Sequence, residues 1–240
     1  MIEMPQLYDG LQKLGICLTQ NQAEQFSCYR KELLDWNQKV NLTSITDQAE
    51  VERLHFLDSV TSVIAEPNLR NMGLSVCDVG SGAGFPGVPL KIIFPFLSLT
   101  LIDSTAKRTD FLNRLLERLG IEDVTIVTSR AELCGHNSDL REAFDLVVSR
   151  AVAQIRVVLE YTLPLCKVGG QVVLPKKGDI TAELAAAREA SIQLGGSVIE
   201  TAGIPNNIFD DQRLLVSVRK VHNTPDRYPR APGVPSKRPL

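Results

Sequence analysis

The sequence predicts an α/β protein in which a seven-stranded, mostly parallel sheet ends in an antiparallel hairpin and follows an N-terminal helical extension. Three observations lead to this prediction. Short β-branched runs alternate with helix-length stretches after residue 73, as in parallel sheets covered by helices on both faces. The last two apolar runs have no helix-length segment between them, which favours an antiparallel pair. The first ~70 residues show only helical periodicity.

The N-terminal part is expected to contain two main helices joined by a polar connection. Apolar residues recur at spacings of three and four over residues 22–40 and again over 47–64, and Pro67 follows the second pattern. The last 18 residues contain five prolines and no periodicity, so an extended tail is expected there. We therefore divide the chain into a helical extension (1–72), a sheet domain (73–222) and a basic, proline-rich tail (223–240).

The sheet domain is expected to contain seven strands and three principal helices. The predicted parallel strands are Ser75–Val79, Leu97–Asp103, Val124–Thr128, Asp145–Ser149 and Gln171–Leu174, and Gly196–Thr201 with Leu214–Val218 form the predicted hairpin. The predicted helices are Ala106–Leu119, Ile155–Cys166 and Ile180–Leu194. An open sheet that ends in a hairpin is more typical of methyltransferases than of dehydrogenases.

Composition and charge indicate a soluble, cytoplasmic protein. Hydrophobic residues make up 44% of the chain and charged residues 22%, which excludes disorder as the dominant state. The formal net charge of -2 excludes a polycation, but residues 151–240 carry 12 basic and 8 acidic side chains, so an RNA-binding surface is expected to draw on this third. Five cysteines without a C-x-x-C pair are expected to be reduced thiols.

No targeting or membrane segment is expected. Residues 1–5 have neither a basic n-region nor an apolar h-region. The apolar stretch 84–102 contains three prolines and Lys91, which favour a turn, a short helix and a strand over a membrane helix.

A glycine-rich loop after the first strand is the strongest motif. Residues 78–87 place Gly80, Gly82 and Gly84 before Pro86, and glycines allow a ligand to approach the backbone closely. The loop also satisfies the dinucleotide fingerprint, with an acid 21 residues after Gly82, and a tight strand–helix connection is a third interpretation.

Two acids favour S-adenosylmethionine over NAD as the ligand. Asp78 precedes the loop, where a carboxylate suits a ligand with an ammonium group and would repel a pyrophosphate. Asp103 ends the second strand, where it can accept hydrogen bonds from both ribose hydroxyls. After the third strand, the Ala131 amide and the region of Glu132 could contact an adenine edge, although a simple helix start would look the same.

No residue after the fourth strand is an evident catalytic base. Ser149 and Arg150 follow that strand, and an arginine cannot act as a base at neutral pH. A guanine N7 has a free lone pair and no proton to remove, so its methylation needs only positioning and desolvation. Arg150 could hold a carboxylate, a guanine or a phosphate, or form a salt bridge. His55 and Asp58, three residues apart, could form a proton pair, but a structural hydrogen bond is the favoured interpretation.

Motifs along essentially the whole chain resemble the bacterial ribosomal RNA small subunit methyltransferase G family, also called glucose-inhibited division protein B. The resemblance is carried by residues 78–87, Asp103-Ser104, Lys107-Arg108, 148–151, Trp36-Asn37, 41–43, His55, 57–59 and the tail 227–240. One departure is Ser129, where many members have glycine.

The resemblance implies a class I, Rossmann-like fold that transfers a methyl group from S-adenosylmethionine to N7 of a guanine in the 530-loop region of 16S rRNA, free or in the 30S particle. No metal and no membrane are expected and no protein partner is evident, and the alternative is a non-catalytic assembly factor that binds S-adenosylmethionine or rRNA. With Gly82 from the loop itself, the expected cofactor contacts are Gly80, Gly82, Phe85, Asp103, Ser104, Ala131, Glu132 and Arg150.

Overall fold

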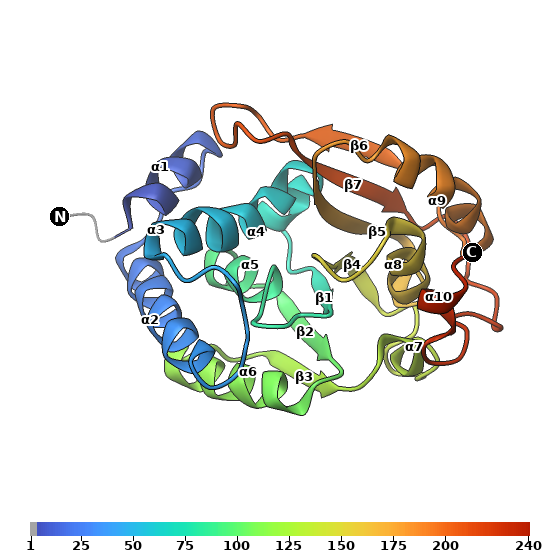
Figure 1. Cartoon of the computed structure of the whole chain (residues 1–240), viewed down its shortest axis with the longest axis horizontal. Helices are drawn as coiled ribbons and strands as arrows, with labels where there is room; N and C mark the ends of the chain where they lie inside the picture. Colours follow the sequence, from blue (N-terminus) through green and yellow to red (C-terminus); the bar gives the residue numbers. More distant parts are fainter. Residues whose placement is uncertain (1–3) are drawn as a thin grey trace.

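The computed structural model describes residues 4–240 and contains a seven-stranded sheet with helices on both faces (Figure 1). Residues 1–3, which belong to the N-terminal run without signal-peptide features, lie outside the described residues. The strand order is β3-β2-β1-β4-β5-β7-β6, in which β1 to β5 pair in parallel and β7 is antiparallel to both of its neighbours. The predicted fold class is confirmed.

The seven strands lie close to their expected positions. They are β1 (Ser75–Val79), β2 (Ser98–Asp103), β3 (Val124–Thr128), β4 (Phe144–Val148), β5 (Cys166–Lys177), β6 (Glu200–Gly203) and β7 (Arg213–Arg219). The largest difference is β5, which begins five residues earlier than predicted and ends three residues later. The residues before β6 make only an isolated bridge, between Gly196 and Lys220.

The helices that follow strands cover the two faces of the sheet. They are α5 (Gly87–Ile93), α6 (Ala106–Leu119), α7 (Ala131–Cys134), α8 (Ile155–Thr162) and α9 (Thr181–Gln193). The prediction that the α8 helix continues to Cys166 is wrong, because Pro164 lacks an amide N–H and disfavours helical backbone at the residue before it. The apolar stretch 84–102 forms loop, α5 and β2 as predicted, and no helix in the described part of the chain is long and apolar enough to cross a membrane.

The extension packs against α5 and α6, on one side of the sheet. It contains α1 (Pro5–Lys13), α2 (Gln20–Asn37) and a helical segment made of α3 (Gln48–Glu50), the π-helix η1 (Val51–Leu57), α4 (Asp58–Val60), the 3-10 helix η2 (Thr61–Ile64) and then η3 (Pro67–Arg70). α2 starts two residues earlier than the predicted helix over residues 22–40, because Thr19 and Gln22 form a capping box. The change of helix type within residues 48–64 is not visible in the periodicity.

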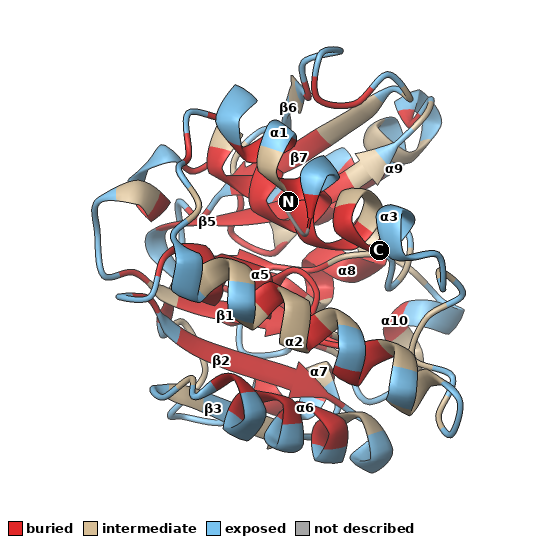
Figure 2. Ribbon diagram, turned by 90° about the vertical axis from the view of Figure 1, so that its left-hand side faces the viewer, coloured by how far each residue is buried: buried red, intermediate tan, exposed pale blue. Residues whose placement is uncertain are grey.

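Two hydrophobic clusters lie on opposite faces of the sheet. Because side chains alternate along a strand, Val76 contributes to the cluster under α2, α5 and α6, and Cys77 to the cluster under α8 and α9. The first cluster also includes Phe26 and Phe56 of the extension. Figure 2 shows the central strands buried between these layers, with exposed residues on the outer sides of the helices. The domain boundaries at 72 and 222 remain a prediction.

The C-terminal tail is not free. Tyr228 is buried in the second cluster, and Arg230 pairs with the fully buried Glu160 of α8, with 2.6 Å between Nη2 and Oε2. The tail also ends in a helical turn, α10 (Val234–Lys237), where an extended conformation was predicted. The charge of Arg230 therefore compensates a buried carboxylate, and this part of the tail packs across the domain.

Candidate functional site

The glycine-rich loop connects the end of β1 to α5. Gly80 and Gly84 have φ angles of +74° and +97°, in the left-handed region that disfavours side chains. A Cβ atom on Gly84 would lie 2.7 Å from the Tyr29 hydroxyl, and one on Gly80 would lie 2.5 Å from Cγ2 of Val152. Glycine is therefore required both by backbone geometry and by the close approach of neighbouring segments.

Asp103 fixes the loop to the end of β2. Its Oδ2 accepts a hydrogen bond of 3.0 Å from the Gly82 amide, its Oδ1 accepts one of 2.8 Å from the Thr105 amide, and Arg108 is 3.4 Å away. Each carboxylate oxygen has two lone pairs, so these bonds leave acceptor capacity for a ligand.

Asp78 lies fully buried beneath the same loop. Its Oδ2 accepts a hydrogen bond of 2.8 Å from the Gly87 amide at the start of α5, while its Oδ1 has no hydrogen-bond partner among the described residues. The pKa of this carboxyl is raised to about 7, mainly by burial, with a smaller contribution in the same direction from Asp103 and opposing contributions from the Gly87 amide and Arg150. Asp78 thus braces the loop from below, and its predicted recognition of an ammonium group remains a hypothesis.

A pocket of about 440 Å³ opens where the parallel strands end, and we call it the strand-end pocket. This volume is within the range of ~300–1,000 Å³ for small-molecule sites. Six of the eight predicted cofactor contacts line it, namely Gly80, Asp103, Ser104, Ala131, Glu132 and Arg150. Ligands of open α/β sheets bind at this edge, so the strand-end pocket is the candidate cofactor site, and the eight cofactor contacts remain a prediction.

Gly82 and Phe85 do not line the strand-end pocket. Gly82 contributes its amide to Asp103. Phe85 is buried, with its ring stacked on His55 at a centroid distance of 4.5 Å and its centroid 5.0 Å from the Arg150 guanidinium carbon. In this structure Phe85, in the glycine-rich loop, packs against both His55 of the extension and Arg150.

Several lining residues of the strand-end pocket were not predicted. Arg108, Arg130, Val152 and Tyr161 also line it. Arg108 and Arg130 stand close in sequence to predicted contacts, so the sequence could have indicated that they line the same pocket. Tyr161 is on α8, and only the packing of that helix brings it to the pocket.

The tail reaches the same pocket through Glu132. Glu132 is buried, and its Oε1 accepts a hydrogen bond of 2.8 Å from the Gly233 amide. The carboxylate therefore holds the tail, which leaves the adjoining backbone of Ala131, another lining residue, as the group with which an adenine could interact.

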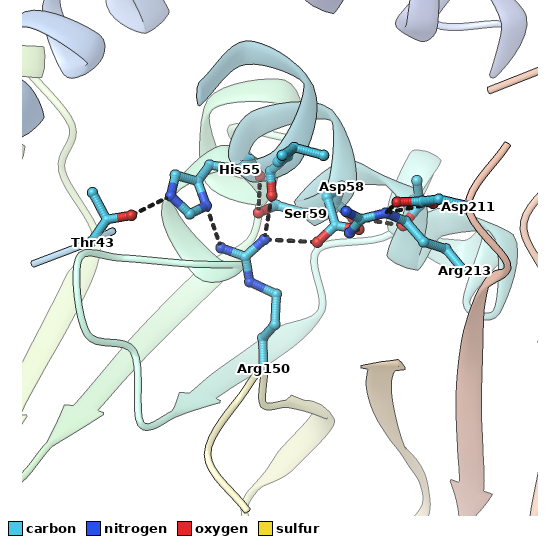
Figure 3. A network of polar contacts seen from close by, with 9 residues as sticks. Thr43, His55, Asp58, Ser59, Arg150, Asp211 and Arg213 are labelled. Atoms are coloured by element: carbon cyan, nitrogen blue, oxygen red, sulfur yellow. Dashed lines mark hydrogen bonds and ion pairs between the residues drawn. The ribbon is translucent and has the colours of Figure 1, made fainter. Parts of the chain in front are cut away.

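Arg150 joins the sheet to the extension (Figure 3). One guanidinium nitrogen donates to Asp58 Oδ2 at 2.7 Å and to the Leu54 carbonyl at 3.0 Å, and the other lies 3.0 Å from His55 Nδ1. Asp58 also pairs with Arg213 at 2.6 Å. His55 and Asp58 therefore both contact Arg150 and do not form a proton pair with each other.

His55 is held in its neutral form. Its pKa is lowered to about 3, mainly by burial and also by the neighbouring charges of Arg150 and Arg213. Its Nδ1 accepts from Arg150, so its Nε2 donates to Thr43 Oγ1 at 2.7 Å. This histidine orients Arg150 and remains neutral near neutral pH.

The arrangement fits S-adenosylmethionine and offers no metal site within residues 4–240. A bare glycine backbone, a carboxylate at the end of β2 and an open backbone after β3 line one pocket of suitable volume. No group of three or more His, Cys, Asp or Glu in that part of the chain is placed to hold a metal ion.

The fold is that of class I S-adenosylmethionine-dependent methyltransferases. Magnesium protoporphyrin IX methyltransferase from Synechocystis, solved with bound S-adenosylmethionine, is similar with a TM-score of 0.53 and 18% identity, over 80% of this chain and 97% of that one. An S-adenosylmethionine-dependent O-methyltransferase from Thermotoga maritima has a TM-score of 0.53 and 16% identity, over 80% and 72% of the two chains.

The sequence comparisons identify the family. The family model described as rRNA small subunit methyltransferase G matches residues 22–210. The ribosomal RNA small subunit methyltransferase G of Lactobacillus johnsonii is 48% identical over 230 residues, 96% of each chain, and that of Dehalococcoides mccartyi strain CBDB1 is 44% identical over 237 residues, 99% of this chain and 100% of the relative. The chain belongs to the rRNA small subunit methyltransferase G family, as the motifs predicted.

Proposed function

We propose that this protein transfers a methyl group from S-adenosylmethionine to N7 of a guanine in the 530-loop region of 16S rRNA. Membership of the family, over nearly the full length of relatives named for small-subunit rRNA methylation, is the observation that carries the proposal. The position of six predicted cofactor contacts around one pocket supports it.

The proposed roles of the cofactor-binding residues follow from their positions. Asp103 and Ser104, at the end of β2, would bind the ribose, and the backbone at Ala131 would lie against the adenine. The loop at Gly80 would pass closest to the ligand, with Gly82 and Phe85 supporting the pocket wall indirectly. When bound, S-adenosylmethionine supplies an electrophilic methyl group.

The state of the neighbouring side chains supports N7 as the acceptor atom. The two groups nearest to Arg150 that could take a proton are His55 and Asp58, and both are engaged with arginines. N7 of guanine needs no proton removed, so orientation of the base and exclusion of water are sufficient contributions from the protein. Arg150 would act as a positioning residue.

We propose 16S rRNA, free or within the 30S particle, as the substrate, and the cytoplasm as the compartment. The five cysteines are free thiols in the structure, as expected in a reducing compartment.

Transfer of a labelled methyl group tests this proposal. Purified protein and labelled S-adenosylmethionine are incubated with 30S particles, with deproteinised 16S rRNA and with 50S particles, all from cells lacking the gene. We expect label in one of the first two substrates and none in 50S particles. Binding of S-adenosylmethionine without transfer to any of them would favour the non-catalytic assembly factor instead.

A further inference from the structure

A second pocket, which we call the network pocket, adjoins the strand-end pocket and has no assigned role. Its volume is about 380 Å³. Ile45, Leu54 and Pro175 provide apolar walls, while Arg150 and Arg213 belong to the polar network at its base. The pocket lies between the extension and the ends of β4 and β5.

The two pockets share one wall. Arg150 and Ala151 line both of them. Ala151 has a φ angle of +57°, and a non-glycine residue in this region costs about 1–2 kcal/mol. The surrounding structure thus holds a strained segment between the two pockets, and such strain is concentrated at functional sites.

The charges of the network pocket suit a nucleotide. Its described lining contains four basic side chains, Arg150, Lys176, Lys177 and Arg213, and one carboxylate, Asp58. The Lys177 side chain is 59% exposed and pairs with Asp211 at 2.9 Å, so its ammonium group can turn toward a phosphate at low cost. The apolar wall offers a surface for a base.

We infer that the network pocket receives the acceptor nucleotide of a single-stranded RNA segment, with the base against the apolar wall and its phosphate near Lys177. The inference rests on the proposed function and extends it by naming the acceptor site. Unpaired RNA can turn a base out of the stack into such a pocket for a few kcal/mol. The two pockets meet at Arg150 and Ala151. At this junction the N7 lone pair would attack the methyl carbon of the donor as its bond to sulfur breaks, and S-adenosylhomocysteine would remain in the strand-end pocket.

Filling the pocket provides the first test. Ile45→Trp places a large side chain in the network pocket from a residue that does not line the strand-end pocket. Ile121→Trp is the matched control, because Ile121 lines a different pocket of about 410 Å³. We expect Ile45→Trp to raise the KM for 30S particles about tenfold or more, with the Kd for S-adenosylmethionine unchanged, and Ile121→Trp to resemble the wild type in both measurements.

Two results would overturn the inference. Methylation by Ile45→Trp with the wild-type KM would show that the acceptor binds elsewhere, and loss of S-adenosylmethionine affinity would assign the pocket to the donor. Failure of the wild type to methylate small-subunit rRNA would instead reject the proposed function, so the two failures are distinguishable.

Charge removal at the two ends of β5 provides a second test that avoids the core. Lys177 and Lys167 are both exposed and paired with an aspartate, but only Lys177 lines the network pocket. Lys177→Gln is expected to weaken rRNA binding and to reduce the slope of log K against log salt by about one. Lys167→Gln is expected to keep the wild-type slope. An equal slope in Lys177→Gln and the wild type would contradict the inference even if Ile45→Trp failed to fold.

Discussion

Three buried aspartates fix the segments that surround the candidate site. Asp78 is a fully buried carboxyl with one amide partner, Asp103 is tied to two loop amides, and Asp58 is shared by two arginines. An ionised carboxylate with few partners is costly to bury. Asp78, whose pKa is raised mainly by burial, is therefore an acid whose charged form the fold disfavours.

Asp78→Asn should change how stability depends on pH. Below about pH 4 the carboxyl is neutral in the folded and the unfolded chain. Its pKa of about 7 in the folded protein means that only the unfolded chain ionises between about pH 4 and 7, so the free energy of unfolding falls as pH rises and the loss is complete above 7. The variant should lack this decrease. At pH 8 its free energy of unfolding should exceed that of the wild type by at most about 4 kcal/mol.

Urea unfolding at pH 5 and pH 8 measures this difference. The exposed Asp110→Asn is the control, and it should follow the wild type. Parallel pH profiles for Asp78→Asn and the wild type would show that Asp78 is ionised in the folded protein throughout this range.

Asp103→Asn should weaken the binding of S-adenosylmethionine. It removes the charge that accepts hydrogen bonds at the end of β2, and hydrogen bonds to charged groups contribute about 1.5–3 kcal/mol. We expect the Kd to rise roughly ten- to a hundredfold in calorimetric titration, with no change in Asp110→Asn. Since Asp103 also holds the Gly82 and Thr105 amides, some loss of stability is expected too. An unchanged Kd would remove Asp103 from the cofactor site.

At the scale of helices and strands, the sequence was informative where local rules decide the structure. β1 and β3 have the predicted bounds, because short runs with β-branched residues between turns leave few alternatives. The C-terminal end of α8 was misplaced although Pro164 was visible. The packing of the tail on α8 could not be predicted, because it depends on the distant pair Arg230–Glu160.

Arg230→Gln tests the role of the tail as a structural element. The substitution leaves the fully buried Glu160 without its cation. Breaking a fully buried pair costs ~3–5 kcal/mol, and because a quarter of the Arg230 side chain is exposed, we expect about 2–3 kcal/mol and a lower Tm. Lys237→Gln and Arg238→Gln, at exposed positions, should keep the wild-type Tm. A wild-type Tm in Arg230→Gln as well as in the two controls would show that the tail does not support the domain.

At the scale of the whole molecule, the site combines residues that the sequence could and could not bring together. Gly80, Asp103 and Arg150 follow parallel strands, so their convergence at one edge was predictable. The position of Tyr161 depends on helix packing, and the contact of His55 with Arg150 depends on how the extension docks. Sequence periodicity contains no information about such docking.

The pH dependence of the rate tests the absence of a catalytic base. With S-adenosylmethionine saturating and under single-turnover conditions, methyl transfer should be nearly constant from about pH 6.5 to 8.5. His55 does not titrate in this range, since its pKa is about 3. A steep limb that persists in Asp78→Asn would indicate a general base and a different acceptor atom.

The most direct test of the central claim is the mass and position of the product on 16S rRNA. Small-subunit rRNA from cells lacking the gene is incubated with the protein and S-adenosylmethionine, digested and analysed by mass spectrometry, with chemical cleavage specific for N7-methylguanine. The proposed function predicts one added methyl group, on N7 of a single guanine in the 530-loop region. A methyl group on another atom or in another region, or no added mass in the presence of bound S-adenosylmethionine, would contradict it.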